Sequence, residues 1–245
     1  MPGASAPGLR ERNKLEKRQR IRDATRELFS ARGFEATTLR QIADRAQVGL
    51  GTLFNYARDK RDLTFLLFND DLARLVEEAK AASARKTGVL EQVMAVWEPH
   101  YHYFARDPVL CRILLRDMYF YVEGEEAERF HRTAARLQDH LEMLLVSAQH
   151  AGLVSGSASA DAMASLLFYV YQGSVRDWME HPRPVAKEGL AALRQLVQMS
   201  FRGLLADGGP VTRKHDAPAR TGDAASDRAK RVTSRCVKRG SRSTN

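Results

Sequence analysis

Hydrophobic residues recur along this chain every three or four positions, which is the period of an α-helix with one buried face. Ile21, Ala24, Leu28 and Phe29 show this spacing near the N-terminus, and no stretch shows the β-branched alternation of a strand. The pattern predicts an all-α protein with about nine helices. We expect the helices near residues 17–32, 39–46, 50–56, 59–82, 88–106, 109–120, 125–151, 160–180 and 186–206.

Short-range signals mark the ends of several of these helices. Gly33 follows the first predicted helix, where glycine commonly ends a helix, and Thr38 is placed as the N-cap of the second. After residue 206 large apolar residues almost vanish. A segment of that composition cannot bury enough apolar surface to fold, so we expect residues 207–245 to be a disordered basic tail.

The formal net charge of the 245 residues is +9, and it is unevenly distributed. Residues 10–61 hold 14 Lys or Arg against 7 Asp or Glu, residues 62–206 hold 15 against 19, and residues 207–245 hold 10 against 4. A basic N-terminal region before a mildly acidic body indicates where a polyanion such as nucleic acid binds. A solubilising surface explains the same charges, so charge alone leaves both interpretations open.

Cysteine usage and missing motifs narrow the class of protein. Cys111 and Cys236 are far apart, and there is no CxxC or Cys/His cluster. We therefore expect no disulfide scaffold and no metal site, as is typical of the reducing cytoplasm. No run approaches the ~18 apolar residues of a membrane-spanning helix. The sequence lacks a nucleophile elbow, a phosphate loop and a metalloprotease motif, so we expect neither an enzyme nor a cofactor.

The segment 37–63 has the spacing of a helix-turn-helix unit, in which a short turn joins two helices. Ile42 and Ala43 supply the inward face of its first helix, Val48 lies in the corner, and Leu53 packs the second helix back. A short helix held at this angle can enter the major groove of DNA, which is about 12 Å wide. An ordinary helical corner fits the same spacing.

Side chains on and beside the second helix of this unit are suited to DNA contact. Asn55 can bond to an adenine edge, and Leu50 and the Thr52 methyl group can contact a thymine methyl group. Hydrogen-bond donors near helix starts are the groups that fix the register of a protein on phosphates. The predicted DNA-contacting residues are Thr38, Arg40, Leu50, Gly51, Thr52, Phe54, Asn55, Tyr56 and Lys60.

At these residues the sequence resembles the TetR family of bacterial transcriptional regulators. The positions that match the family signature without a gap are Phe29, Gly33, Phe34, Thr37, Thr38, Ile42, Ala43, Ala46, Val48, Gly51, Thr52, Leu53, Phe54, Tyr56, Lys60 and Leu63. The resemblance implies a DNA-binding regulator that acts as a dimer on an inverted-repeat operator in double-stranded DNA.

Five positions depart from the family signature. Gln47 stands where the turn glycine is usual, and a positive φ there would cost Gln roughly 1 kcal/mol. Gly49 stands in place of the usual Ser or Thr cap, and Ala57 in place of Phe. Arg61 replaces an acidic residue, and Phe54 lacks the usual tyrosine hydroxyl. These changes affect the details of base reading and leave the fold prediction unchanged.

The resemblance also implies how the chain is divided. We expect a flexible basic arm at 1–16, a three-helix DNA-binding domain at 17–63 and a six-helix domain at 64–206 for ligand sensing and dimerisation. In the family the last two helices pair with their copies, so a homodimer would form through the helices near 160–180 and 186–206. Broad apolar faces support this pairing, with Gly173 permitting close approach, although an internal core would show such faces too.

Aromatic residues supply candidates for a small-molecule pocket. Trp97, His100, Tyr101 and Phe104 share one face of a predicted helix, since they are spaced by three and four. Large aromatics with a few polar tips line small-molecule cavities, and they also form ordinary cores. The predicted ligand-binding residues are Trp97, His100, Tyr101, Phe104, Met118, Tyr119, Phe168, Tyr171 and Gln172.

The sequence thus predicts a cytoplasmic transcriptional regulator, with a ligand-responsive repressor as the first hypothesis. The effector would be a small molecule that binds two states of the dimer differently, because only such a ligand shifts their populations. The alternative is a DNA-binding factor of the same fold that acts through protein partners or as an architectural protein, without a small-molecule effector.

Overall fold

The computed structural model describes residues 8–202, and every regular element in this part of the chain is an α-helix. The predicted all-α fold, with a helix-turn-helix unit of three helices followed by six more, is confirmed. The nine helices of the described residues are α1 (Leu9–Arg32), α2 (Leu39–Arg45), α3 (Leu50–Phe54), α4 (Lys60–Ala84), α5 (Val89–Arg106), α6 (Pro108–Asp117), α7 (Glu125–His150), α8 (Ala160–Glu180) and α9 (Ala186–Arg202).

Helix α1 begins eight residues earlier than predicted. We expected residues 1–16 to form a flexible arm, but α1 starts at Leu9, directly after Gly8. The segment 9–16 contains neither Gly nor Pro and is rich in Leu, Arg, Glu and Lys, which are good helix formers. Its basic side chains are therefore carried on a helix. Residues 1–7 and the predicted tail at 207–245 lie outside the described residues.

Two further helices end earlier than predicted. Helix α3 ends at Phe54, because the amide of Tyr56 turns back to the carbonyl of Leu53 at 2.9 Å. Helix α6 ends at Asp117, where the amide of Tyr121 donates to the Asp117 carbonyl at 3.1 Å. A short turn follows each of these two helix ends.

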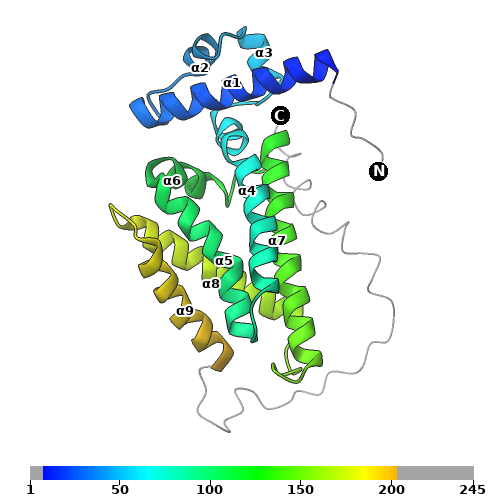
Figure 1. Ribbon diagram of the computed structural model, residues 1–245. Helices are drawn as coiled ribbons and strands as arrows, with labels where there is room; N and C mark the ends of the chain where they lie inside the picture. Colours follow the sequence, from blue (N-terminus) through cyan, green and yellow to red (C-terminus); the bar gives the residue numbers. More distant parts are fainter. Residues whose placement is uncertain (1–7, 203–245) are drawn as a thin grey trace, which may run out of the picture. The chain divides into compact units, whose positions relative to one another are not determined.

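Helices α1, α2 and α3 lie together at one end of the described unit, and α4 leads from them into the remaining helices (Figure 1). Helix α1 packs against α2 and α4, and α2 packs against α3. Ile21, Phe29, Ile42 and Leu53 form the buried core of this three-helix unit. Helix α2 starts at a capping box, in which the Thr38 hydroxyl accepts from Gln41 and the Gln41 side chain accepts from Thr38.

The remaining helices form a second layer of packing around α4 and α5. Helix α4 packs against α5 and α7, α7 packs against α8, and α9 covers α5 and α8. Trp97 of α5 stacks on Tyr171 of α8, with ring centroids 4.1 Å apart. No helix within residues 8–202 combines the length and apolar character needed to cross a membrane.

Helix α9 approaches α5 and α8 most closely at Gly189. A Cβ atom at this position would lie 2.5 Å from Cε1 of Tyr101 and 2.9 Å from Cδ1 of Trp178. The indole Nε1 of Trp178 donates to the carbonyl of Val185 at 3.0 Å, just before α9 begins. At Gly173 the opposite holds, since a Cβ there would have no heavy atom within 4 Å. The close approach expected at Gly173 therefore does not occur among the described residues of a single chain.

Charged side chains join α1 to α4 and α7. Arg18 pairs with Glu126 at 3.1 Å. Arg22 pairs with Asp70 at 2.9 Å and donates to the Leu67 carbonyl at 3.1 Å. Burial raises the pKa of Asp70, but the hydrogen bond from Arg129 and the charges of the neighbouring arginines outweigh burial and lower it. These contacts fix the orientation of the three-helix unit on the rest of the chain.

A buried carboxylate holds the start of α4 against the start of α7. Asp62 accepts hydrogen bonds from the backbone amides of Arg58 at 3.0 Å and Ala127 at 3.0 Å. Burial raises the pKa of Asp62, and these amide donors partly offset the increase. Gly124 has φ +100°, and a Cβ on it would lie 2.5 Å from the Asp62 carboxylate. Only glycine leaves room for this contact.

Candidate DNA-binding surface and ligand cavity

The turn between α2 and α3 contains a non-glycine residue in the left-handed region. Gln47 has φ 55°, which confirms that this position requires a positive φ. The conformation lets the amide of Val48 return to the carbonyl of Ala43 at 3.0 Å. Leu53 is fully buried beneath the turn, so α3 is fixed at an angle to α2 by its own apolar contact.

The predicted base-reading residues lie on the outer side of α3. Gly51, Phe54 and Asn55 are exposed, and Leu50 and Thr52 are half-buried. A Cβ at Gly51 would have no heavy atom within 4 Å, so this side of α3 is open. No acidic residue lies on α3. The surface can therefore approach a polyanion without electrostatic repulsion from the helix itself.

The predicted phosphate-contacting residues differ in how many contacts their side chains already make within the protein. Arg40 is exposed near the start of α2, and among the described residues it makes no hydrogen bond or ion pair. Lys60 donates to the carbonyls of Phe34 at 2.8 Å and Glu35 at 3.3 Å, and its ammonium group lies over the Phe34 ring. The Thr38 hydroxyl serves the capping box. Arg40 is thus the freest of the three, while Lys60 ties the start of α4 to the α1–α2 connection.

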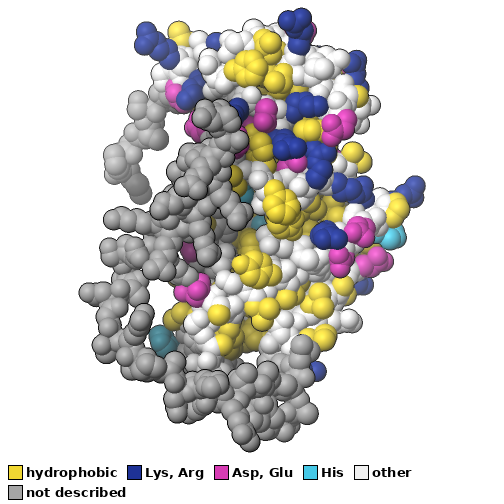
Figure 2. Space-filling model, turned by 180° about the vertical axis from the view of Figure 1, so that it is seen from behind, with side chains coloured by type: hydrophobic (Ala, Val, Ile, Leu, Met, Phe, Trp, Pro, Cys, Tyr) yellow, Lys and Arg dark blue, Asp and Glu magenta, His cyan; other side chains and the backbone are white. Residues whose placement is uncertain are grey.

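The first turns of α1 extend the basic surface next to α3. The hydroxyl of Tyr56 donates to the backbone carbonyl of Lys14 at 3.3 Å, which brings the two segments together. Arg10, Arg12 and Lys17 are exposed on this part of α1. On the face drawn in Figure 2, most Lys and Arg side chains lie in the upper half, whereas hydrophobic side chains are spread from top to bottom. The helix-forming composition of residues 9–16 was the signal in the sequence for this extension.

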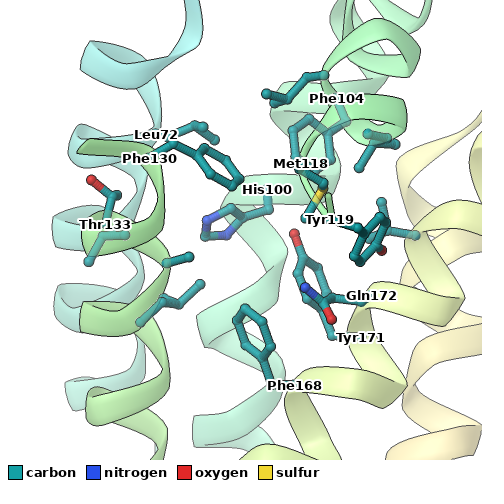
Figure 3. Close-up of a pocket in the computed structure, with 16 residues that line it drawn as sticks. Leu72, His100, Phe104, Met118, Tyr119, Phe130, Thr133, Phe168, Tyr171 and Gln172 are labelled. Carbon is teal, nitrogen blue, oxygen red and sulfur yellow. The ribbon is translucent and has the colours of Figure 1, made fainter. Parts of the chain in front are cut away.

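A second site lies inside the larger set of helices. Side chains from α4, α5, α7 and α8, and from α6 with the turn after it, line an apolar cavity (Figure 3). The space in it that the centre of a water molecule can occupy is about 50 Å³, enough for about four waters. The lining residues are Leu72, Val76, His100, Phe104, Leu114, Leu115, Met118, Tyr119, Phe130, Thr133, Ala134, Leu137, Phe168, Tyr171, Gln172 and Val175.

Seven of the nine predicted ligand-binding residues line this cavity, and Trp97 and Tyr101 do not. Trp97 is buried behind Tyr171, on which it stacks. Tyr101 is buried beneath α9, and its hydroxyl donates to Ser174 at 2.9 Å. The sequence did not indicate that residues of α4 and α7 line the cavity. Their spacing marks them only as core, since the pairing of α4 with α7 is not visible in a single sequence.

His100 is the polar group at the centre of this cavity. Figure 3 shows its ring among Phe130, Phe168 and Tyr171. Its side chain is buried, and a backbone hydrogen bond at Val96 partly opposes the effect of burial on its pKa. Burial lowers the pKa of His100 to about 4, so the ring is neutral near pH 7. No Lys, Arg, Asp or Glu lines the cavity, which suits an uncharged, largely apolar ligand.

Apolar side chains on α8 and α9 remain uncovered in the single chain. Tyr169 is 67% exposed, Leu166 49% and Met199 51%. Contiguous exposed apolar side chains mark surfaces that bind another molecule. These are the two helices through which the sequence predicts a homodimer.

Comparison with known proteins identifies the N-terminal unit. Residues 21–65 match the family described as "Bacterial regulatory proteins, tetR family". This match contains α2, the turn at Gln47 and α3. The chain belongs to the TetR family. It is therefore a helix-turn-helix transcriptional regulator and not an enzyme, as the sequence predicted.

Curated relatives of this TetR-family chain include both repressors and an activator. The HTH-type transcriptional repressor KstR of Rhodococcus jostii is 32% identical over 113 residues, which cover 46% of this chain and 52% of that relative. This match thus spans about half the length of KstR. The HTH-type transcriptional activator FasR of Mycolicibacterium smegmatis is 25% identical over 202 residues, covering 81% of this chain and 89% of FasR.

Solved structures extend the similarity beyond the helix-turn-helix unit to most of this chain. FadR of Thermus thermophilus, a TetR-family repressor in complex with lauroyl-CoA, is 27% identical, with a TM-score of 0.58. The alignment covers 84% of this chain and 100% of that one. FadR of Bacillus subtilis, in complex with stearoyl-CoA, has a TM-score of 0.62 at 18% identity over 76% of this chain and 99% of that one. At that identity the likeness shows the fold alone.

Proposed function

We propose that this TetR-family regulator is an acyl-CoA-responsive repressor that binds an inverted-repeat operator as a homodimer. The apolar cavity around His100 carries the proposal. A DNA-binding factor controlled only by protein partners has no use for such a cavity. The lauroyl-CoA complex of the 27% identical FadR of Thermus thermophilus supports a long-chain acyl thioester as the effector class.

The character of the cavity supports an acyl chain in particular. Its lining is apolar apart from the neutral His100 and a few hydroxyl and amide groups. A free fatty acid would bring a carboxylate into a site without a cationic side chain, and burying an unpaired charge is costly. A thioester has no charge at that end of the chain. The neutral imidazole of His100, which lines the cavity, can then meet a polar atom of the ligand.

The size of the cavity supports a conformational response. Pockets for drug-sized ligands occupy roughly 300 Å³ or more, and this cavity has about 50 Å³ of space. An acyl chain must therefore push its lining apart. Leu72 and Val76 of the lining belong to α4, whose first residue Lys60 is bonded to the α1–α2 connection. Displacement of α4 would change the position of α3.

Exposed apolar faces of α8 and α9 support a homodimer. An isologous pairing of these helices would cover Tyr169, Leu166 and Met199 on both chains. Two recognition helices related by a two-fold axis read half-sites about one DNA turn, or a multiple of it, apart. On that arrangement Asn55, Leu50 and Thr52 would read base edges, and Arg40 and Tyr56 would contact phosphates.

The first test is to select genomic fragments with the purified protein at near-physiological salt and sequence them. Recovery of one short inverted repeat supports site-specific binding by a dimer. Unrelated fragments, with binding that vanishes as salt rises, would show non-specific attraction alone.

The effector is tested on the selected operator. Lauroyl-CoA should weaken operator binding by the purified protein, because it must favour the state that binds DNA poorly. Full retention of operator affinity at saturating lauroyl-CoA would favour the partner-regulated alternative. A promoter-reporter assay separates repression from activation, which is also a candidate because FasR is a transcriptional activator.

A further inference from the structure

A basic groove on the surface adjoins the apolar cavity. It is lined by Arg112, Leu115, Arg116, Tyr119, Arg176, Met179 and Glu180 and has about 480 Å³ of space. Leu115 and Tyr119 line both the groove and the cavity. Leu115 on α6 and Tyr119 just after this helix therefore lie between the apolar cavity and the open, charged groove.

The lining of this groove contains three arginines and one glutamate. The concentration of positive charge is local, since residues 62–206 hold 15 basic against 19 acidic residues. Arginine is suited to phosphate, because its planar guanidinium group presents several donors in a fixed arrangement. Exposed aromatic side chains lie beside the charges, with Tyr119 39% and Phe120 92% exposed. An aromatic base could stack on them.

The three arginines are held to different degrees. Arg112 donates to the carbonyls of Met179 and His181, both at 2.8 Å, and so fixes the end of α8. Arg116 pairs with Asp117 at 3.2 Å and Glu35 at 3.1 Å. Arg176 makes only a 3.9 Å contact with Glu180, and both side chains are 71% exposed. Arg176 can thus turn to a ligand without breaking a structural contact.

We propose that this groove binds the phosphates of the coenzyme A head, while the acyl chain enters the adjoining cavity past Leu115 and Tyr119. The inference rests on the proposed function, since it assigns the head of the same effector. This assignment explains why an uncharged cavity adjoins a groove with three arginines. An apolar ligand without an anionic head would not require such an arrangement. The ligand class is then a long-chain acyl thioester of a phosphorylated carrier.

The test compares two thioesters that differ in the phosphorylated nucleotide of the head. Binding of lauroyl-CoA and of lauroyl-pantetheine, which has the same chain and thioester but no phosphate, is measured by calorimetry at several salt concentrations. The full chain is used as wild type, Arg176→Gln and Arg176→Glu. Arg132→Gln is the matched control, because Arg132 is 65% exposed on α7 and also makes only an i,i+4 contact, with Glu128 at 3.6 Å.

We expect Arg176→Gln to weaken lauroyl-CoA binding about three- to tenfold, which is the range for one exposed charge-assisted contact. Arg176→Glu should weaken it further, and both should flatten the salt dependence. Binding of lauroyl-pantetheine should stay unchanged in both variants, and Arg132→Gln should bind both ligands like the wild type.

Other outcomes separate the inference from the proposed function. If wild type binds lauroyl-CoA but neither Arg176 variant changes its affinity, the effector class stands and the groove assignment is wrong. The same holds if both ligands weaken equally, since the effect would then come from the cavity. If wild type binds neither thioester, the effector class is wrong and the groove assignment falls with it.

Discussion

Gln47 shows how one residue can be placed against its own backbone preference. Its φ of 55° lies in the left-handed region, where a side chain crowds the following carbonyl. The turn keeps this conformation because α2 and α3 are both fixed by buried side chains, Ile42 on one and Leu53 on the other. The strain is confined to this residue, so a substitution of Gln47 that relieves it should change the free energy of unfolding.

We expect Gln47→Gly to raise the free energy of unfolding by about 0.5–1 kcal/mol. Glycine removes the strain of the left-handed region, while its greater freedom in the unfolded chain offsets part of the gain. Urea unfolding followed by circular dichroism measures the change. Gln47→Ala is the control, because it keeps a Cβ at the positive φ and should bring no gain. An equal gain from Ala would mean that the backbone is not the cause.

Asn55 is the residue for which base reading can be tested most simply. It is exposed at the C-terminal end of α3, so Asn55→Ala removes no buried contact. We expect a loss of about 1–3 kcal/mol in operator binding, concentrated at one base pair of each half-site. Binding to operators substituted at each position measures this. A uniform loss across all operators would instead indicate a phosphate contact.

His100 should make stability depend on pH in a defined window. Its pKa is lowered to about 4 by burial, whereas an unfolded histidine takes up a proton near pH 6.5. Between these values the unfolded state binds more protons, so stability falls as the pH decreases from about 6.5 to about 4. The loss is on the order of 3 kcal/mol.

Urea unfolding of wild type and His100→Gln at pH 7 and pH 4.5 measures this contribution. The variant should show a shallower fall, and His102→Gln, which changes a surface histidine of the same helix, should keep the wild-type fall. Parallel curves for wild type and His100→Gln would contradict a neutral, buried His100.

At the scale of elements, local sequence signals predicted where helices begin and end, whereas the sequence did not show which distant helices pack together. The ends of α8 at residues 160 and 180 follow the prediction, because Ser159 caps the helix and the sequence HPRP follows it. The helix-turn-helix was predictable because all its contacts lie within about 50 residues of sequence. The cavity was predictable only on α5, α6 and α8, where aromatic residues stand out. Leu72 and Phe130 resemble any other core residue until α4 and α7 are packed together.

The contact of α9 with α5 and α8 gives a prediction at this scale. Gly189→Ala places a Cβ against the rings of Tyr101 and Trp178, so α9 must shift. We expect a loss of about 1–3 kcal/mol in unfolding free energy, as for overpacked cores, measured as a lower urea midpoint. Gly173→Ala is the matched control, because its Cβ meets open space and alanine favours a helix. A neutral Gly189→Ala would show that α9 packs less closely.

The whole molecule is expected to be a dimer whose two halves act together on DNA. Tyr169→Glu places a charge at the centre of the exposed apolar face of α8, where Tyr169 is 67% exposed. We expect the variant to be monomeric by light scattering and to lose about a hundredfold in operator affinity, because the two half-sites then bind independently. Val109→Glu, at a 54% exposed apolar residue of α6, should remain dimeric. A dimeric Tyr169→Glu would place the interface elsewhere.

The single carboxylate of Asp62 joins two parts of the chain that are 65 residues apart. It accepts from the amide that precedes α4 and from an amide in the first turn of α7, and Gly124 leaves no space for it to move aside. Neither amide can be released alone without stranding a buried acceptor. In hydrogen exchange, the amides of Arg58 and Ala127 should therefore open as one cooperative unit with a shared rate, although one precedes α4 and the other lies in the first turn of α7.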